Sequence, residues 1–214
     1  MPLTVPTILT WVRIALIPAF VGIYYLPETW LSPAQKNWAG ALIFSAGAIT
    51  DWADGYLARR LGQTSAFGAF LDPVADKLMV AAALILLVSM ERADPVPAFI
   101  VVGREIAISA LREWMAEIGQ RRSVAVSTLG KFKTAAQLTA IIALLLYEPV
   151  IPGVSTPLVG TVALWIAVGL TLWSMIYYLR LAAPYLRGAR PTSLASDTKR
   201  GAEELGPSAR SAGE

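Results

Sequence analysis

The sequence predicts an all-α integral membrane protein in which six transmembrane helices form one bundle. Composition supports this class, because 56% of the residues are hydrophobic and only 15% are charged, against about 25% charged in soluble domains. A second observation is the succession of apolar runs near the length of about 20 residues that a helix needs to cross a bilayer. A third is that the few charged residues come in clusters.

Each apolar run is expected to form one span. In chain order the spans cover residues 8–25, 37–57, 65–90, 96–118, 129–147 and 158–179. The first is expected to remain in place as a span, because it has no basic leader and Arg13 interrupts its apolar run. Helix-breaking prolines are expected in the connections, at Pro27, Pro33, Pro95, Pro149 and Pro152. Pro18 and Pro73 fall inside spans and are expected to kink them.

Basic residues predict the orientation of the bundle. They concentrate in the second and fourth connections and in the tail, at Arg59, Arg60, Arg121, Arg122, Lys131, Lys133, Arg187, Arg190, Lys199, Arg200 and Arg210. The positive-inside rule then places both termini in the cytoplasm. Residues 1–185 are expected to form the membrane domain. Residues 186–214 are expected to form a polar, disordered cytoplasmic tail, which either contacts anionic headgroups or only solubilises the chain.

The chain contains no Cys and no His. This excludes disulfides, thiolate or imidazole metal ligands, and a Ser-His-Asp triad. Any proton chemistry must therefore use Asp, Glu, Lys, Tyr or a bound metal.

Carboxylates cluster at the end of the second span and the start of the third. Asp51 and Asp54 are three residues apart, and Gly68, Asp72 and Asp76 are each four apart. Residues with these spacings share one helix face, so two packed helices would bring the four aspartates together. We expect the third span to continue as a kinked helix through Pro73, although Asp72 could instead cap a helix that begins there.

Such a carboxylate cluster must take up protons or bind cations. Oxygen ligands suit hard ions such as Mg²⁺, Mn²⁺ or Ca²⁺, and two such ions suggest phosphoryl transfer. The competing interpretation is a structural ion-pair network with Arg59, Arg60 and Lys77. Gly55 and Gly68 either leave room for a bulky group or serve close helix packing.

The stretch "DWADGYLARRLGQTSAFGAFLDPVAD" resembles the signature of the CDP-alcohol phosphotransferases, D-x2-D-G-x2-A-R-x8-G-x3-D-x3-D. All of its defined positions are present, at Asp51, Asp54, Gly55, Ala58, Arg59, Gly68, Asp72 and Asp76. The stretches "GREIAISALREWMAEIG" and "SVAVSTLGKFKTAAQ" resemble the bacterial phosphatidylglycerophosphate synthase branch of that family. The opening "VPTILTWVRIALIP" also resembles it, with Thr7 where Asn is expected.

The resemblance implies an enzyme of phospholipid biosynthesis in the cytoplasmic (inner) membrane, often homodimeric, with its site open to the cytoplasm. It would transfer a phosphatidyl group from CDP-diacylglycerol to glycerol 3-phosphate and release CMP. It implies that Asp51, Asp54, Asp72 and Asp76 hold the divalent metal, Mg²⁺ or Mn²⁺ as two ions, and that Asp76 is also the general base. The implied CDP site consists of Asp54, Gly55, Ala58, Arg59 and Gly68.

Glycerol 3-phosphate needs a cationic pocket of its own. The candidates near the cytoplasmic ends of the later spans are Arg112, Lys131, Lys133, Arg104 and Arg180. Arg104 lies deeper and is expected to pair with Glu105 or with an aspartate, and Arg180 could close the rim.

Two other functions remain open from sequence. The same chemistry could serve another acceptor, such as inositol phosphate, serine, a phospholipid or an aminoalcohol. A cation transporter with intramembrane carboxylates is a more remote alternative, disfavoured because no internal repeat is visible and the acids lie toward one surface.

Overall fold

The computed structural model of the chain describes residues 5–61, 66–119, 128–150 and 152–186; within these ranges, the side chains of 5–7, 52–61, 66–70, 128–131 and 186 fall outside the description. The described part is all-helical, with no strand. Its helices are α1 (Val5–Tyr25), α2 (Pro33–Leu61), α3 (Ala66–Ser89), α4 (Pro95–Glu117), α5 (Thr128–Leu146) and α6 (Thr156–Leu186).

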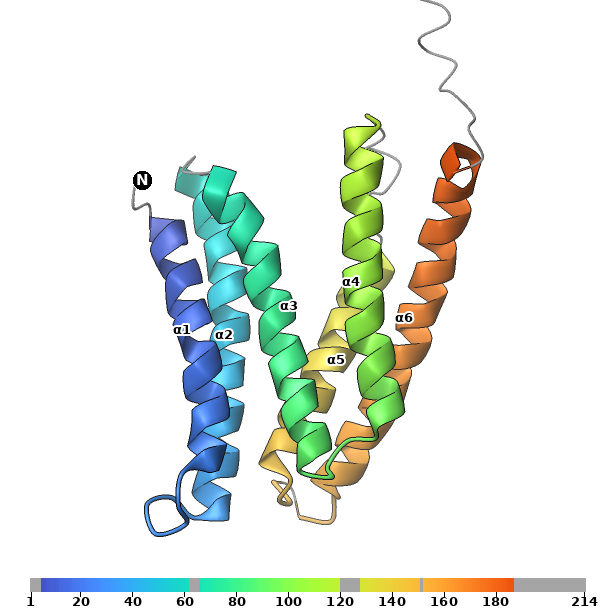
Figure 1. Ribbon diagram of the computed structural model, residues 1–214. Helices are drawn as coiled ribbons and strands as arrows, with labels where there is room; N and C mark the ends of the chain where they lie inside the picture. Colours follow the sequence, from blue (N-terminus) through green and yellow to red (C-terminus); the bar gives the residue numbers. More distant parts are fainter. Residues whose placement is uncertain (1–4, 62–65, 120–127, 151, 187–214) are drawn as a thin grey trace, which may run out of the picture.

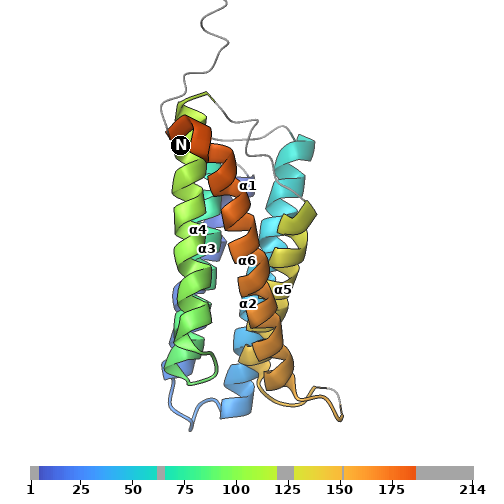
Figure 2. The ribbon, with the colours of Figure 1, turned by 90° about the vertical axis from the view of Figure 1, so that its right-hand side faces the viewer.

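The helices run alternately up and down in one elongated bundle (Figures 1 and 2). One half consists of α1 packed on α2 and α3, and the other of α6 packed on α4 and α5. Contacts of α2 with α5 and of α3 with α4 join the halves. The start of α1 and the end of α6 lie at the same end of the bundle, the upper end in Figure 1.

The expected spans agree with the observed helices to within a few residues at most boundaries. The placement of Pro33 and Pro95 in connections was wrong, because each is the first residue of a helix. Proline fits there, since the first helical N–H has no partner inside the helix. The Ser32 hydroxyl accepts a hydrogen bond from the backbone N–H of Gln35, and the Gln35 side-chain oxygen accepts one from the backbone N–H of Ser32. At the start of α4, the Asp94 side chain accepts from the backbone N–H of Val96 and caps the helix. The expected end of the last span at 179 was also too early, because α6 continues to Leu186.

The apolar core occupies the lower half of the bundle. Its large, fully buried side chains are Phe20, Phe44, Leu84, Leu87, Ile141, Leu144 and Leu145. Gly160 allows α6 to approach α5 closely, since a Cβ there would lie 2.7 Å from the Leu144 side chain. The helix α3 passes through Pro73 without a break, as expected, and so carries Asp72 and Asp76 on one continuous helix.

Within the described ranges, two helices are long and apolar enough to cross a membrane by length and composition, over residues 8–25 and 156–185. The outer surface of the described part also exposes large apolar side chains on every helix for which side chains are described, among them Trp11, Leu42, Ile85, Phe99, Phe132 and Trp173. The tail after residue 186 and the basic residues Arg121 and Arg122 lie outside the described residues, so the expectations for them remain predictions.

Candidate active site

Arg13 of α1 is buried where α1 packs against α2 and α3. Its side chain is only 1% exposed, and its Nη1 atom lies 3.2 Å from Asp51 Oδ1 and 2.6 Å from Asp76 Oδ1. Because one nitrogen contacts both carboxylates, Asp51 of α2 and Asp76 of α3 lie together, whereas the expected convergence of all four aspartates remains a prediction. The two aspartate side chains are 47% and 39% exposed, so the pair remains open to a ligand.

Asp72 lies one turn before Asp76 and has a different partner on α1. The Thr10 hydroxyl donates a hydrogen bond to Asp72 Oδ1. Thr10 and Arg13 are three residues apart and therefore share one face of α1. This face supplies partners to carboxylates from two other helices, a role that the sequence interpretation did not assign to α1.

Among the described side chains, Arg13 pairs with Asp51 and Asp76, and no ion pair joins Lys77 to either of them. The side chains of Asp54, Gly55, Ala58, Arg59, Arg60 and Gly68 lie outside the described residues, and their expected roles remain predictions. Among the side chains that the structure does describe, no group of three or more acidic residues is close enough to hold a metal ion. Sequence could have flagged Arg13, since an arginine inside an apolar span usually has a function.

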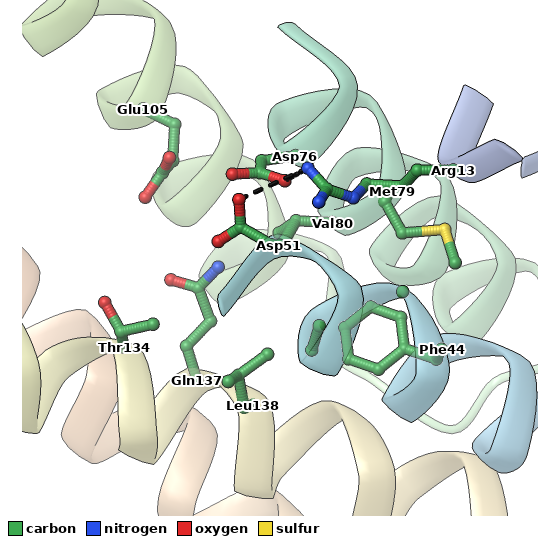
Figure 3. A pocket seen from close by; sticks show the side chains of 12 residues that line it. Arg13, Phe44, Asp51, Asp76, Met79, Val80, Glu105, Thr134, Gln137 and Leu138 are labelled. Carbon is green, nitrogen blue, oxygen red and sulfur yellow. Dashed lines mark hydrogen bonds and ion pairs between the residues drawn. The ribbon is translucent and has the colours of Figure 1, made fainter. Parts of the chain in front are cut away.

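A cavity of about 290 Å³ opens beside Arg13, Asp51 and Asp76. Residues of five helices surround it: Arg13, Phe44, Gly47, Ala48, Asp51, Asp76, Met79, Val80, Glu105, Thr134, Gln137 and Leu138. Figure 3 shows that the second oxygen of Asp76 is turned away from Arg13, toward the side of Glu105. The carboxylate that contacts Arg13 therefore also lines the cavity.

A second charged cluster lies across the cavity on α4 and α5. Glu105 Oε1 accepts from Lys133 Nζ at 2.7 Å and from Arg104 Nη1 at 3.1 Å. Both cations are buried, and the expected pairing of Arg104 with Glu105 is confirmed. Sequence did not assign Glu105 to the site itself, although it is the carboxylate that brings two of the expected acceptor-binding cations together.

The remaining expected acceptor-binding cations lie elsewhere or outside the description. Arg112 donates to the Tyr178 hydroxyl at 3.2 Å, with its guanidinium 5.1 Å from the centre of that ring. Arg180 is exposed on α6. Neither residue lines the cavity as the described side chains define it. The Lys131 side chain is outside the described residues.

Two neutral polar residues of α5 complete the wall, and sequence reasoning missed both. Thr134 and Gln137 are three residues apart and both line the cavity. Gln137 is 5% exposed, and its Oε1 atom has no hydrogen-bond partner among the described residues. Its polarity within an apolar run was the available signal.

The arrangement suits chemistry on a charged, phosphate-containing substrate. Two carboxylates already gather around one positive group, and their oxygen atoms are the ligands that hard divalent ions prefer. Buried cations across the cavity offer a place for an anion. Asp51 and Asp76 could therefore supply oxygen ligands to a metal ion, although the described side chains alone form no complete ligand set.

Comparison with known proteins agrees with this chemistry. Residues 3–173 match the model of the CDP-alcohol phosphatidyltransferase family. Three similar proteins carry the name CDP-diacylglycerol–glycerol-3-phosphate 3-phosphatidyltransferase. They come from Pectobacterium atrosepticum, with 53% identity over 185 residues, Shigella flexneri serotype 5b, with 51% over 184, and Escherichia coli K12, with 50% over 184. In each case the match covers 85% of this chain and 96% of the relative.

Proposed function

The chain belongs to the CDP-alcohol phosphatidyltransferase family, and we propose on this premise that it transfers a phosphatidyl group from CDP-diacylglycerol to glycerol 3-phosphate. The products are phosphatidylglycerophosphate and CMP. The observation that carries the proposal is a cavity lined by Asp51 and Asp76 and also by Glu105, which holds the buried cations Arg104 and Lys133. The names of relatives that this chain matches over nearly their whole length favour glycerol 3-phosphate as the acceptor.

The helices α1 to α6 are proposed to span the cytoplasmic (inner) membrane, with both termini and the cavity mouth on the cytoplasmic side. The apolar outer surface and the two strongly apolar helices support this placement. Residues 1–185 would then be the membrane domain and 186–214 a cytoplasmic tail. Assembly as a homodimer remains a prediction from the family resemblance.

The donor headgroup is proposed to bind at the ends of α2 and α3. Asp51, Asp54, Asp72 and Asp76 would hold divalent metal, Mg²⁺ or Mn²⁺ as two ions. When bound, such ions neutralise charge on the pyrophosphate and on the departing CMP. The family signature assigns the nucleotide itself to Asp54, Gly55, Ala58, Arg59 and Gly68.

Asp76 is proposed as the general base. The Asp76 oxygen that does not contact Arg13 would accept the proton of the acceptor's C1 hydroxyl. At the same time the hydroxyl oxygen of the acceptor would form a bond to the β-phosphorus. The bond between this phosphorus and the bridging oxygen breaks, and CMP leaves with that oxygen. Arg13 orients Asp76 through its other oxygen, at 2.6 Å. The chain has no His, so a carboxylate is the available base for this step.

The phosphate of the acceptor is proposed to bind the cations Arg112, Lys131, Lys133, Arg104 and Arg180. Lys133 is the leading member, because it is buried and its carboxylate partner Glu105 lines the cavity. An incoming phosphate would share this ammonium group with Glu105.

The decisive experiment is an assay of the purified protein in detergent. CDP-diacylglycerol is supplied with radiolabelled glycerol 3-phosphate, inositol phosphate or serine, and both CMP and the labelled lipid are measured. We expect labelled lipid only with glycerol 3-phosphate, and loss of activity on chelation with recovery on adding Mg²⁺ or Mn²⁺. Activity with inositol phosphate alone would disprove the proposed acceptor, and undiminished activity after thorough chelation would disprove the proposed metal site.

A further inference from the structure

The side-chain oxygen of Gln137 has no hydrogen-bond partner within the described part of the chain. The residue is 95% buried, since only 5% of its surface is exposed. A buried polar atom without a partner lowers stability, and the few that native proteins retain usually have a reason. Because Gln137 also lines the cavity, the missing partner is expected to come from a bound molecule.

The position of Gln137 places it between the two halves of the proposed reaction site. It follows Lys133 by four residues, so the two share one face of α5, about 6 Å apart along the axis. Figure 3 shows its amide extending from α5 into the space between Asp51, Glu105 and Thr134. A small molecule that joins the base to the phosphate pocket would pass this amide.

An amide oxygen can only accept a hydrogen bond, so its missing partner must be a donor such as a hydroxyl group. Glycerol 3-phosphate has two hydroxyl groups and one phosphate. The phosphate is assigned to Lys133 and its neighbours, and the C1 hydroxyl to Asp76. The C2 hydroxyl lies between them and is the remaining donor.

We infer that Gln137 recognises the C2 hydroxyl of the acceptor, with its Oε1 atom accepting a hydrogen bond from that hydroxyl. This inference rests on the proposed function and deepens it, because it names a residue that decides which acceptor is used. An acceptor without a hydroxyl at this position leaves the amide oxygen buried and unpaired, and sites of this kind reject such analogues strongly.

The test uses 3-hydroxypropyl phosphate, which differs from glycerol 3-phosphate only by the missing C2 hydroxyl. We measure kcat/KM for both acceptors with the purified full-length protein and CDP-diacylglycerol. The wild type is expected to prefer glycerol 3-phosphate by about 100-fold. Gln137→Leu, which keeps the side-chain volume, is expected to reduce this preference to about threefold or less by losing activity toward glycerol 3-phosphate alone.

Leu138→Val is the matched control, since Leu138 lines the same cavity from the next position of α5. It is expected to keep the wild-type preference, whatever its absolute rate. If Gln137→Leu does not yield folded protein, Gln137→Asn replaces it, because the shorter amide cannot reach the same point and should also lose the preference.

Two results would overturn the inference. One is equal use of both acceptors by the wild type, and the other is an unchanged preference in the Gln137 variants, whether both activities are retained or both fall equally. Each is compatible with the proposed function so long as the wild type is active with glycerol 3-phosphate. A wild type that is inactive with glycerol 3-phosphate but active with another acceptor would instead overturn the proposed function, and the inference with it.

Discussion

Each end of the bundle contains an arginine that ties several elements together, and the two have different partners. Arg13 contacts two carboxylates, Asp51 and Asp76, beside the cavity. Arg92, between α3 and α4, donates to the Asn37 side chain at 2.8 Å and to the Leu145 carbonyl at 3.0 Å. Its guanidinium also lies 4.4 Å from the centre of the Tyr147 ring.

The difference separates a functional network from a structural one. Arg92 donates to two neutral oxygen atoms, one near the start of α2 and one near the end of α5. It therefore holds these helix ends together beside the apolar core. Arg13 faces two carboxyl groups with one positive charge, so it cannot neutralise both of them when both are ionised. Residual charge of this kind attracts a further cation, whereas neutral, satisfied partners do not.

The largest effect is expected for Asp76→Asn. The amide keeps the shape of the side chain but cannot accept the hydroxyl proton, so turnover should fall by about 10³-fold, within the range for a general base. Binding of CDP-diacylglycerol, measured by displacement of labelled donor, should change little. Near-normal turnover in this variant would remove Asp76 from the role of base.

Arg13→Gln is expected to have the next largest effect. Without the guanidinium, Asp51 and Asp76 lose the group that orients them, and turnover should fall by about 100-fold. Added Mn²⁺ should raise the thermal unfolding midpoint of the variant more than that of the wild type, because the ion would supply the missing positive charge.

Arg13→Lys keeps the positive charge and is the control. It should recover part of the turnover and should respond to Mn²⁺ more nearly as the wild type does. Equal responses to Mn²⁺ in the wild type and Arg13→Gln would show that Arg13 does not neutralise the metal-binding carboxylates. The comparison between the two arginines would then lose its basis.

The sequence predicted most of the fold because apolar length and helix-breaking residues are local signals. The fourth apolar segment, expected at 96–118, is observed as a helix over Pro95–Glu117. The last span was underestimated because its apolar run ends at Arg180, whereas a helix continues wherever its backbone hydrogen bonds can form. The length of an apolar run thus predicts that a helix is present, but it predicts less well the residue at which the helix ends.

The site was predictable only in part. Spacing along α2 and α3 indicated that Asp51 and Asp76 would share facing surfaces, because that signal requires only helical periodicity. Their shared partner Arg13 is 38 and 63 residues away in the chain. Contacts over such separations depend on how helices pack and rotate, and neither follows from spacing within one helix. The same reason explains why Gln137 was missed.

Lys133→Ala should have a smaller effect, confined to the acceptor side of the cavity. Loss of the ammonium group removes one charge-assisted contact to phosphate, so KM for glycerol 3-phosphate should rise about tenfold. KM for CDP-diacylglycerol should change by less than about twofold, since the donor is bound from α2 and α3. Equal increases in both KM values would show that Lys133 supports the whole site and does not form a phosphate pocket, and Lys133→Arg should retain most of the affinity.

Arg92→Met completes the comparison and is expected to have the smallest effect on activity. Methionine keeps much of the apolar stem but leaves the Asn37 amide, which is 4% exposed, and the Leu145 carbonyl without their donor. The free energy of unfolding should fall by about 2 kcal/mol, measured by denaturant titration in detergent, while kcat and both KM values stay within about twofold of the wild type. Arg92→Lys keeps the charge and one donor and should lose less stability. A large loss of activity in Arg92→Met at a temperature where the variant is folded would mean that the lower end of the bundle communicates with the cavity. The two arginine networks would then have to be treated as one.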